Sequence, residues 1–159
     1  MTPFPFWMAG LLVLLLLLSC DTFEGRDAVG ATRVSAGTGI GVVYVLCPIA
    51  EVRTLSLYKA PGGRPDYDPE DLLWKIASEA GSKQDVYVVG VTPPGFVEEV
   101  PLTTDLTGGQ GLAVLVEAEP AGEASVIFEI ENLREDELLR GDEYFDPDEF
   151  REQHLERCS

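Results

Sequence analysis

The sequence predicts a mainly β protein in which short antiparallel strands form a two-sheet sandwich and the chain ends in a short helix. Apolar, β-branched runs alternate with turn residues at short intervals through the middle of the chain, as in an all-β fold. The acidic C-terminal segment carries helix signals instead. With 159 residues, the chain has room for one domain with a single core.

Seven runs are predicted to be strands: 39–47, 52–59, 72–78, 85–91, 96–103, 112–119 and 125–131. Several of them alternate with the two-residue period of a strand that buries one face. In the last run, Val126, Phe128 and Ile130 share one face, while Glu129 and Glu131 share the other. This alternation indicates an antiparallel sheet with one face in water.

Seven short strands within residues 39–133 resemble the architecture of immunoglobulin-like and fibronectin-like sandwiches. Trp74 falls in the third run, where such domains often bury a tryptophan. The chain lacks their usual cysteine pair between the sheets, because neither Cys47 nor Cys158 falls in a suitable strand. The resemblance implies an immunoglobulin-like sandwich and carries no function with it.

The acidic extension 134–159 is predicted to contain a helix from residue 147 to about residue 157. Its start is marked by an N-cap, a proline at the first position and an acid at the third: Asp146, Pro147 and Glu149. Phe150 and His154 are four residues apart and therefore share a face. Leu155 lies near that stripe, and we expect the helix to pack on the sandwich through Phe150 and Leu155.

The N-terminal segment is typical of a signal peptide. Residues 4–19 carry no charge, and their apolar core, 10–19, is too short to cross a bilayer comfortably, which takes roughly 20 residues. It ends at Leu17-Leu18-Ser19-Cys20, which resembles the lipobox of bacterial lipoproteins. In that family the cysteine receives a diacylglyceryl group and becomes the new N-terminus. The resemblance covers residues 1 to 21 and implies a signal peptide at 1–19 and lipidation of Cys20.

The first ten residues depart from the usual signal pattern because they contain no Lys or Arg, whereas an n-region is normally positive. Two alternatives to a lipid anchor therefore stay open: plain secretion after ordinary cleavage, and an uncleaved membrane anchor. All three place the domain outside the cytoplasm, at a membrane or cell surface or in the medium. Residues 20–38 mix small and charged residues without an apolar period, which predicts a flexible tether.

The cysteine count fits export. Of three cysteines, lipidation of Cys20 leaves Cys47 and Cys158, and we expect these two to form a disulfide. The alternative is two free thiols. A catalytic thiol is disfavoured, because the chain has one histidine, His154, which lies only four residues before Cys158.

The charge is strongly acidic, with 28 Asp and Glu against 11 Lys and Arg and a net charge of −17. This balance argues against nucleic acid, whose phosphates require a basic patch. Eight carboxylates within residues 135–149 suggest a calcium site as an alternative. No glycine stands where an EF-hand loop needs one, and Pro147 interrupts the spacing. The weak candidate ligands are Asp142, Asp146, Asp148 and Glu149.

The sequence contains no Ser-His-Asp set, no phosphate-binding loop and no cofactor motif. The predicted function is therefore a non-enzymatic, lipid-anchored envelope protein that presents an acidic sandwich for binding or structural roles, with an envelope partner that the sequence does not identify. A calcium-responsive module and an unrecognised hydrolase are the alternatives.

Overall fold

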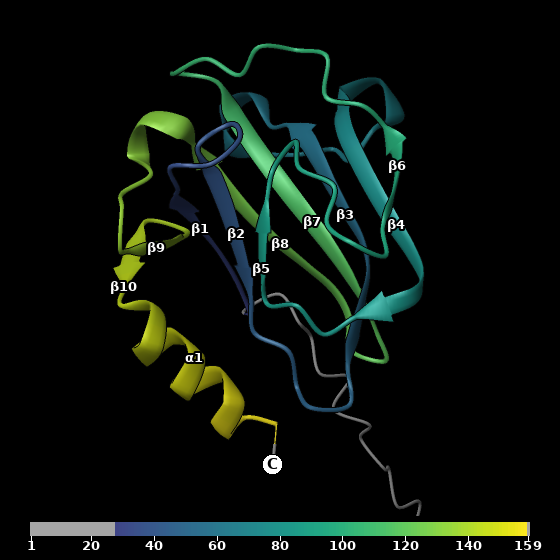
Figure 1. Ribbon diagram of the computed structural model, residues 1–159. Coiled ribbons are helices and arrows are strands. Elements are labelled where there is room, and N and C mark those ends of the chain that lie inside the picture. Colours follow the sequence, from purple (N-terminus) through teal and green to yellow (C-terminus); the bar gives the residue numbers. More distant parts are fainter. Residues whose placement is uncertain (1–27, 159) are drawn as a thin grey trace, which may run out of the picture.

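The structure is a computed structural model that describes residues 28–158. Within that range, ten strands form two antiparallel five-stranded sheets, and one α-helix follows them at the C-terminal end (Figure 1). This arrangement confirms the predicted mainly β sandwich with a short C-terminal helix.

The first sheet has the order β10-β9-β1-β2-β5. Its strands are β1 (Val29–Arg33), β2 (Ile40–Tyr44), β5 (Val86–Val88), β9 (Leu138–Arg140) and β10 (Glu143–Phe145). β1 lies at the centre, where Ala31 pairs with Val42 on one side and with Leu139 on the other.

The second sheet has the order β6-β4-β3-β7-β8. Its strands are β3 (Glu51–Lys59), β4 (Leu72–Ser82), β6 (Val97–Val100), β7 (Gly111–Glu119) and β8 (Gly122–Glu129). At its centre, Leu57 pairs with Trp74 and with Val114. Within residues 28–158, three short 3-10 segments lie in the connections: η2 (Pro61–Gly63), η3 (Pro69–Asp71) and η4 (Ile130–Asn132).

Each of the seven predicted runs overlaps one strand, β2 to β8 in order. The predicted alternation in the last run is confirmed as far as Glu129, because Val126 and Phe128 are buried and Glu129 is exposed. The prediction is wrong beyond that point, since Ile130 and Glu131 belong to η4 and not to a strand.

Three strands lie outside the segments predicted to form the sandwich. The sequence predicts a tether up to residue 38, but Val29–Arg33 of that segment form β1. The acidic extension contributes β9 and β10 to the same sheet. The sandwich therefore has ten strands, not about seven, and spans residues 29–145. Residues 20–27 of the predicted tether lie outside the described residues.

The main core lies between the two sheets. Tyr44, Leu57, Trp74 and Val114 point into it and are fully buried. β2 is buried on both faces, which explains why its sequence shows no polar alternation. Its Val43, together with Val45 just after the strand, belongs to a second, smaller cluster with Leu138 and Phe150.

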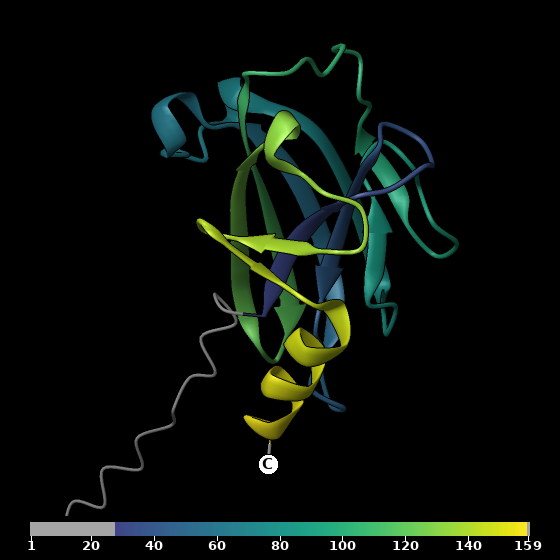
Figure 2. The same cartoon turned by 90° about the vertical axis from the view of Figure 1, so that its left-hand side faces the viewer.

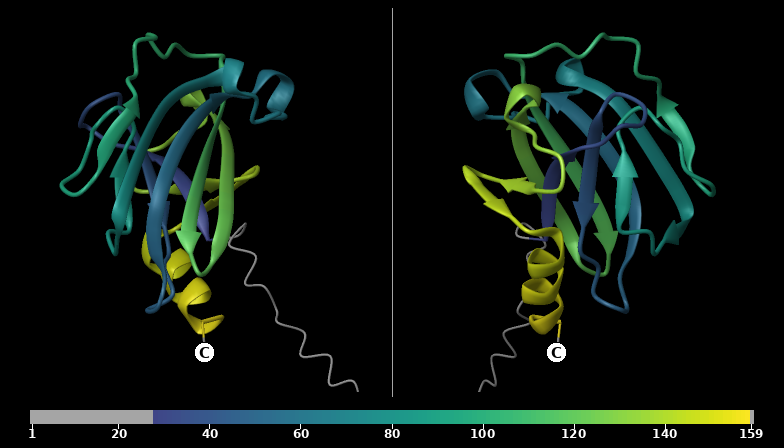
Figure 3. Two further views of the ribbon diagram at one scale, coloured as in Figure 1. Left: turned by 90° about the vertical axis from the view of Figure 1, so that its right-hand side faces the viewer. Right: turned by 60° about the vertical axis from the view of Figure 1, so that its left-hand side comes forward.

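Helix α1 (Pro147–Glu156) closes that second cluster. Asp146 caps the helix as predicted, since its Oδ1 accepts hydrogen bonds from the backbone N–H groups of Asp148 and Glu149. Phe150 is buried, as predicted, and His154 on the same face is buried too. The prediction for Leu155 is wrong, because this side chain is 42% exposed. Figures 2 and 3 show the helix below β9 and β10, at the lower end of the molecule.

The predicted disulfide between Cys47 and Cys158 is present, with an S–S distance of 2.06 Å and Cα atoms 5.4 Å apart. It joins the segment after β2 to the residues that follow α1. The bond fastens the C-terminal helix to the first sheet.

Candidate functional site

Among the hollows on the surface of residues 28–158, three are candidate sites. The first, about 590 Å³, lies at the upper end of the sandwich beside the β1–β2 turn. It is lined by Gly37, Thr38, Gly90, Leu102, Thr103, Thr104, Asp105 and Leu106. Asp105 is the one charged residue among these, so this lining offers mainly hydroxyl and apolar contacts.

The second hollow, about 400 Å³, lies where η2, β7, β8 and β10 approach each other. It is lined by Gly63, Gly111, Ile127, Phe128, Glu129, Asn132, Leu139, Gly141, Asp142 and Tyr144. At its edge the hydroxyl of Tyr144 donates to the carbonyl of Asn132 at 2.8 Å, and the guanidinium of Arg134 lies 3.6 Å from the Tyr144 ring centre. These contacts fix the Tyr144 side chain against the sheet.

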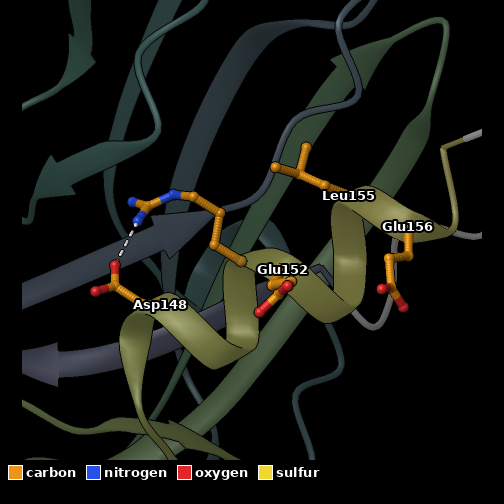
Figure 4. A pocket seen from close by; sticks show the side chains of 5 residues that line it. Asp148, Glu152, Leu155 and Glu156 are labelled. Carbon is orange, nitrogen blue, oxygen red and sulfur yellow. Dashed lines mark hydrogen bonds and ion pairs between the residues drawn. The ribbon is translucent and has the colours of Figure 1, made fainter.

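The third hollow, about 470 Å³, runs along α1 and is lined by Asp148, Arg151, Glu152, Leu155 and Glu156 (Figure 4). Arg151 is held by two carboxylates, since its Nη1 lies 3.3 Å from Asp148 and its Nη2 lies 2.8 Å from Asp85. In Figure 4 the Leu155 side chain points to a different side of the helix from Glu152 and Glu156.

The four weak metal candidates have separate surroundings. Asp146 is the helix cap, Asp148 pairs with Arg151, and Glu149 accepts a hydrogen bond from Gln153 at 3.0 Å. Asp142 lines the second hollow instead. Among residues 28–158, no three His, Cys, Asp or Glu side chains are grouped so that they could hold a metal ion.

The adjacent acids Glu98 and Glu99 illustrate how a strand separates neighbouring carboxylates. Glu98 accepts a hydrogen bond from the indole N–H of Trp74 at 3.2 Å, whereas Glu99 lies 2.9 Å from the amine of Lys75. The hydrogen bond to Glu99 raises the pKa of Lys75. The two carboxylates serve different neighbours and do not form an acid–base pair.

His154 lies in the contact between α1 and the sheet. Its Nδ1 is 2.7 Å from the carbonyl oxygen of Phe150, and it lines none of the three hollows. Because a carbonyl oxygen only accepts, Nδ1 donates the proton in this contact. The buried Nε2 has no hydrogen-bond partner among the described residues. This geometry gives the imidazole a packing role.

Sequence reasoning missed an apolar feature beside the disulfide. Ile49, two residues after Cys47, is 78% exposed, and Leu155 lies three residues before Cys158. Ala28, the first described residue, is at the same place, because its carbonyl accepts a hydrogen bond from the N–H of Val45 at 2.8 Å. We call this region, formed by Ala28, residues 45–50 and residues 154–158, the disulfide end. In the sequence, the one indication of this feature is an isoleucine, Ile49, that directly follows Pro48.

Cys20, the predicted lipidation site, lies outside the described residues, and so does the whole predicted signal peptide. Within residues 28–158 no helix has the length and apolar character to span a membrane.

Comparison with known proteins finds no matching family model, no similar curated protein and no similar solved structure.

Proposed function

We propose that this chain is an exported bacterial lipoprotein, anchored by lipid on Cys20, that holds a non-enzymatic acidic sandwich at the outer surface of a membrane. The observation that carries the proposal is the Cys47–Cys158 disulfide. Disulfides persist in oxidising compartments outside the cytoplasm. The bond also accounts for two of the three cysteines, so Cys20, at the end of the apolar leader, is left for another role.

The chemistry of lipidation supports the same assignment. A thiol directly after an apolar segment lies at the membrane surface, where a lipid donor is available. Two acyl chains give stable anchoring, whereas a single chain binds only marginally. The small Ser19 before Cys20 and Leu17 two residues before Ser19 match the lipobox pattern that this resemblance rests on.

A binding or structural role is favoured over catalysis by the surroundings of the polar side chains. The histidine is buried on the face of α1 that packs on the sheet, Asp146 caps the helix, and Asp148 pairs with Arg151. The hollow beside the β1–β2 turn is lined by threonines, glycines and leucines with one aspartate. None of these arrangements pairs a nucleophile with a base, a common way in which enzymes activate a nucleophile.

The test is expression of the full chain, with its own leader, in a bacterial host. We expect the protein to enter the detergent phase of a phase-separating detergent and to incorporate a labelled fatty acid. Cys20→Ser should abolish both properties and leave the leader uncleaved. Ser19→Ala is the matched control, since it keeps a small residue before the cysteine and should be processed like the wild type. Normal processing of Cys20→Ser, with no lipid on the wild type, would replace this proposal with plain secretion.

A further inference from the structure

The disulfide end combines two exposed apolar side chains with the point where the N-terminal segment joins the sandwich. Ile49 is 78% exposed and Leu155 is 42% exposed, among the five large hydrophobic side chains that are exposed in residues 28–158. Both lie within three residues of the disulfide, whose Cα atoms are 5.4 Å apart. The bond therefore keeps the loop that carries Ile49 close to the last turn of α1.

Hydrogen bonds also hold the loop of this end in place. The N–H of Ala50 donates to the carbonyl of Cys47 at 2.9 Å, so the loop is a closed turn with Ile49 at its tip. The amine of Lys83 donates to the carbonyl of Pro48 at 2.9 Å and braces this turn from the β4–β5 connection. These two hydrogen bonds hold the turn with the Ile49 side chain exposed at its tip.

The number of residues between Cys20 and Ala28 limits how far the disulfide end can lie from the proposed anchor. Cys20 lies eight residues before Ala28, and eight residues span at most about 28 Å when fully extended. Ala28 is bonded to Val45, two residues before Cys47. A lipid on Cys20 thus holds the disulfide end within that distance of the bilayer. Figure 1 shows the β2–β3 connection and the end of α1 together at the lower end of the sandwich.

We infer that the disulfide end is the membrane-facing surface of the protein, and that Ile49 and Leu155 contact the lipid surface to which Cys20 is anchored. This inference rests on the proposed lipid anchor. We expect a lipid surface to be the partner of the disulfide end, because the short segment between Cys20 and Ala28 keeps the bilayer close to it, at a high effective concentration. Two side chains alone are a weak contact, and the net charge of −17 opposes binding to anionic lipid. The anchor is therefore what makes the contact persistent.

The test uses the full lipidated protein in phosphatidylcholine vesicles that contain lipid brominated on its acyl chains, which quenches nearby tryptophan. Ile49→Trp and Leu155→Trp are the two reporters. The mature protein has one tryptophan of its own, the buried Trp74, which gives a constant background because Trp7 leaves with the leader. The control is Val91→Trp. Val91 is also 42% exposed. It lies beside Gly37 of the β1–β2 turn, at the end of β2 that is opposite to the disulfide.

We expect both reporters to lose most of their added emission and to shift to shorter wavelength, while Val91→Trp emits as it does in unbrominated vesicles. Flotation of the vesicles, measured on the same samples, reports the anchor separately. If the protein floats and either reporter is quenched no more than Val91→Trp, the membrane-facing assignment is overturned while the anchor stands. If the wild type fails to float, the anchor itself is overturned, and this inference is lost with it.

Discussion

The rings of Phe150 and His154 lie 4.2 Å apart, centroid to centroid, on the face of α1 that covers the first sheet. Both side chains are buried, and Phe150 also contacts the ring of Phe145, just before the helix, at 5.7 Å. The acidic C-terminal segment is therefore an integral part of the fold, because its aromatic side chains cover the outer face of β2.

Truncation of Phe150 tests this role of the helix. Phe150→Ala removes a fully buried aromatic from the second cluster, and we expect the free energy of unfolding to fall by about 3–5 kcal/mol. Glu152→Ala, on the exposed side of the same helix, should change it by less than about 0.5 kcal/mol. Urea denaturation measures both. Similar small losses for the two variants would show that α1 does not contribute to the core.

The disulfide gives a second, independent measurement of the same attachment. The intact mass of the domain should rise by two hydrogens on reduction, and peptide mapping should join the fragments that contain Cys47 and Cys158. In the chain-entropy model a bridge over about a hundred residues contributes about 4–5 kcal/mol. We expect the double serine variant to lose less than this, because Phe150 still packs in the reduced protein. Free reaction of both thiols with a maleimide in the native state would contradict the bridge.

Tyr44 offers a test at a polar group of the main core. Its hydroxyl is buried and forms no hydrogen bond to the described residues, so Tyr44→Phe removes no internal hydrogen bond. At neutral pH we expect this variant to be as stable as the wild type or more stable by about 1 kcal/mol. Tyr144→Phe is the control, since the Tyr144 hydroxyl donates to the carbonyl of Asn132, and it should be slightly destabilising.

The same variant predicts a pH dependence. Burial raises the pKa of Tyr44 above its ordinary value of 10.0, so the folded protein holds the phenolic proton more tightly than the unfolded chain does. The stability that the folded protein gains from this difference in pKa is fully present below about pH 10 and is lost as the pH rises through the folded-state pKa. The wild type should therefore lose stability above about pH 10 more steeply than Tyr44→Phe. Parallel curves for the two proteins would contradict the burial of this hydroxyl.

Calcium tests the alternative function. Because Asp146, Asp148 and Glu149 already cap the helix or accept hydrogen bonds within it, we expect the thermal midpoint to be the same in EDTA and in millimolar calcium. A specific ion at a hundred times its Kd would add about 2.7 kcal/mol. A rise in the midpoint that disappears in Asp148→Asn would favour the calcium-responsive module over a purely structural role for these acids.

The parts of the fold that the sequence predicted well are those with a strong local signal. The alternation around Phe128 and the cap-proline start at Asp146 each depend on a few neighbouring residues, and both are confirmed. β1 has no such signal, because both its faces are buried and its central residues, Gly30, Ala31 and Thr32, are small. Gly30 shows the reason, since a Cβ there would lie 3.3 Å from the Cβ of Leu138. A small residue needed for close packing looks, in the sequence, like part of a linker.

The exposed side chains of the disulfide end also depend on tertiary structure, and only part of this surface could be predicted from the sequence. The pairing of Cys47 with Cys158 followed from counting cysteines, and it is confirmed. The exposure of Leu155 did not follow, because a residue next to the buried His154 lies at the margin of the helix face. Whether the Leu155 side chain is buried or exposed depends on how α1 packs against β2. The position of Ile49 depends likewise on the turn that Cys47 and Ala50 close.

The central claim, a lipid anchor on Cys20, is tested most directly by mass spectrometry of the N-terminal tryptic peptide from membrane-extracted protein. We predict a peptide that begins at Cys20, ends at Arg26 and carries the mass of a diacylglyceryl group on the cysteine. Cleavage at another residue with an unmodified thiol, or a peptide that still contains Ser19 joined to Cys20, would contradict it.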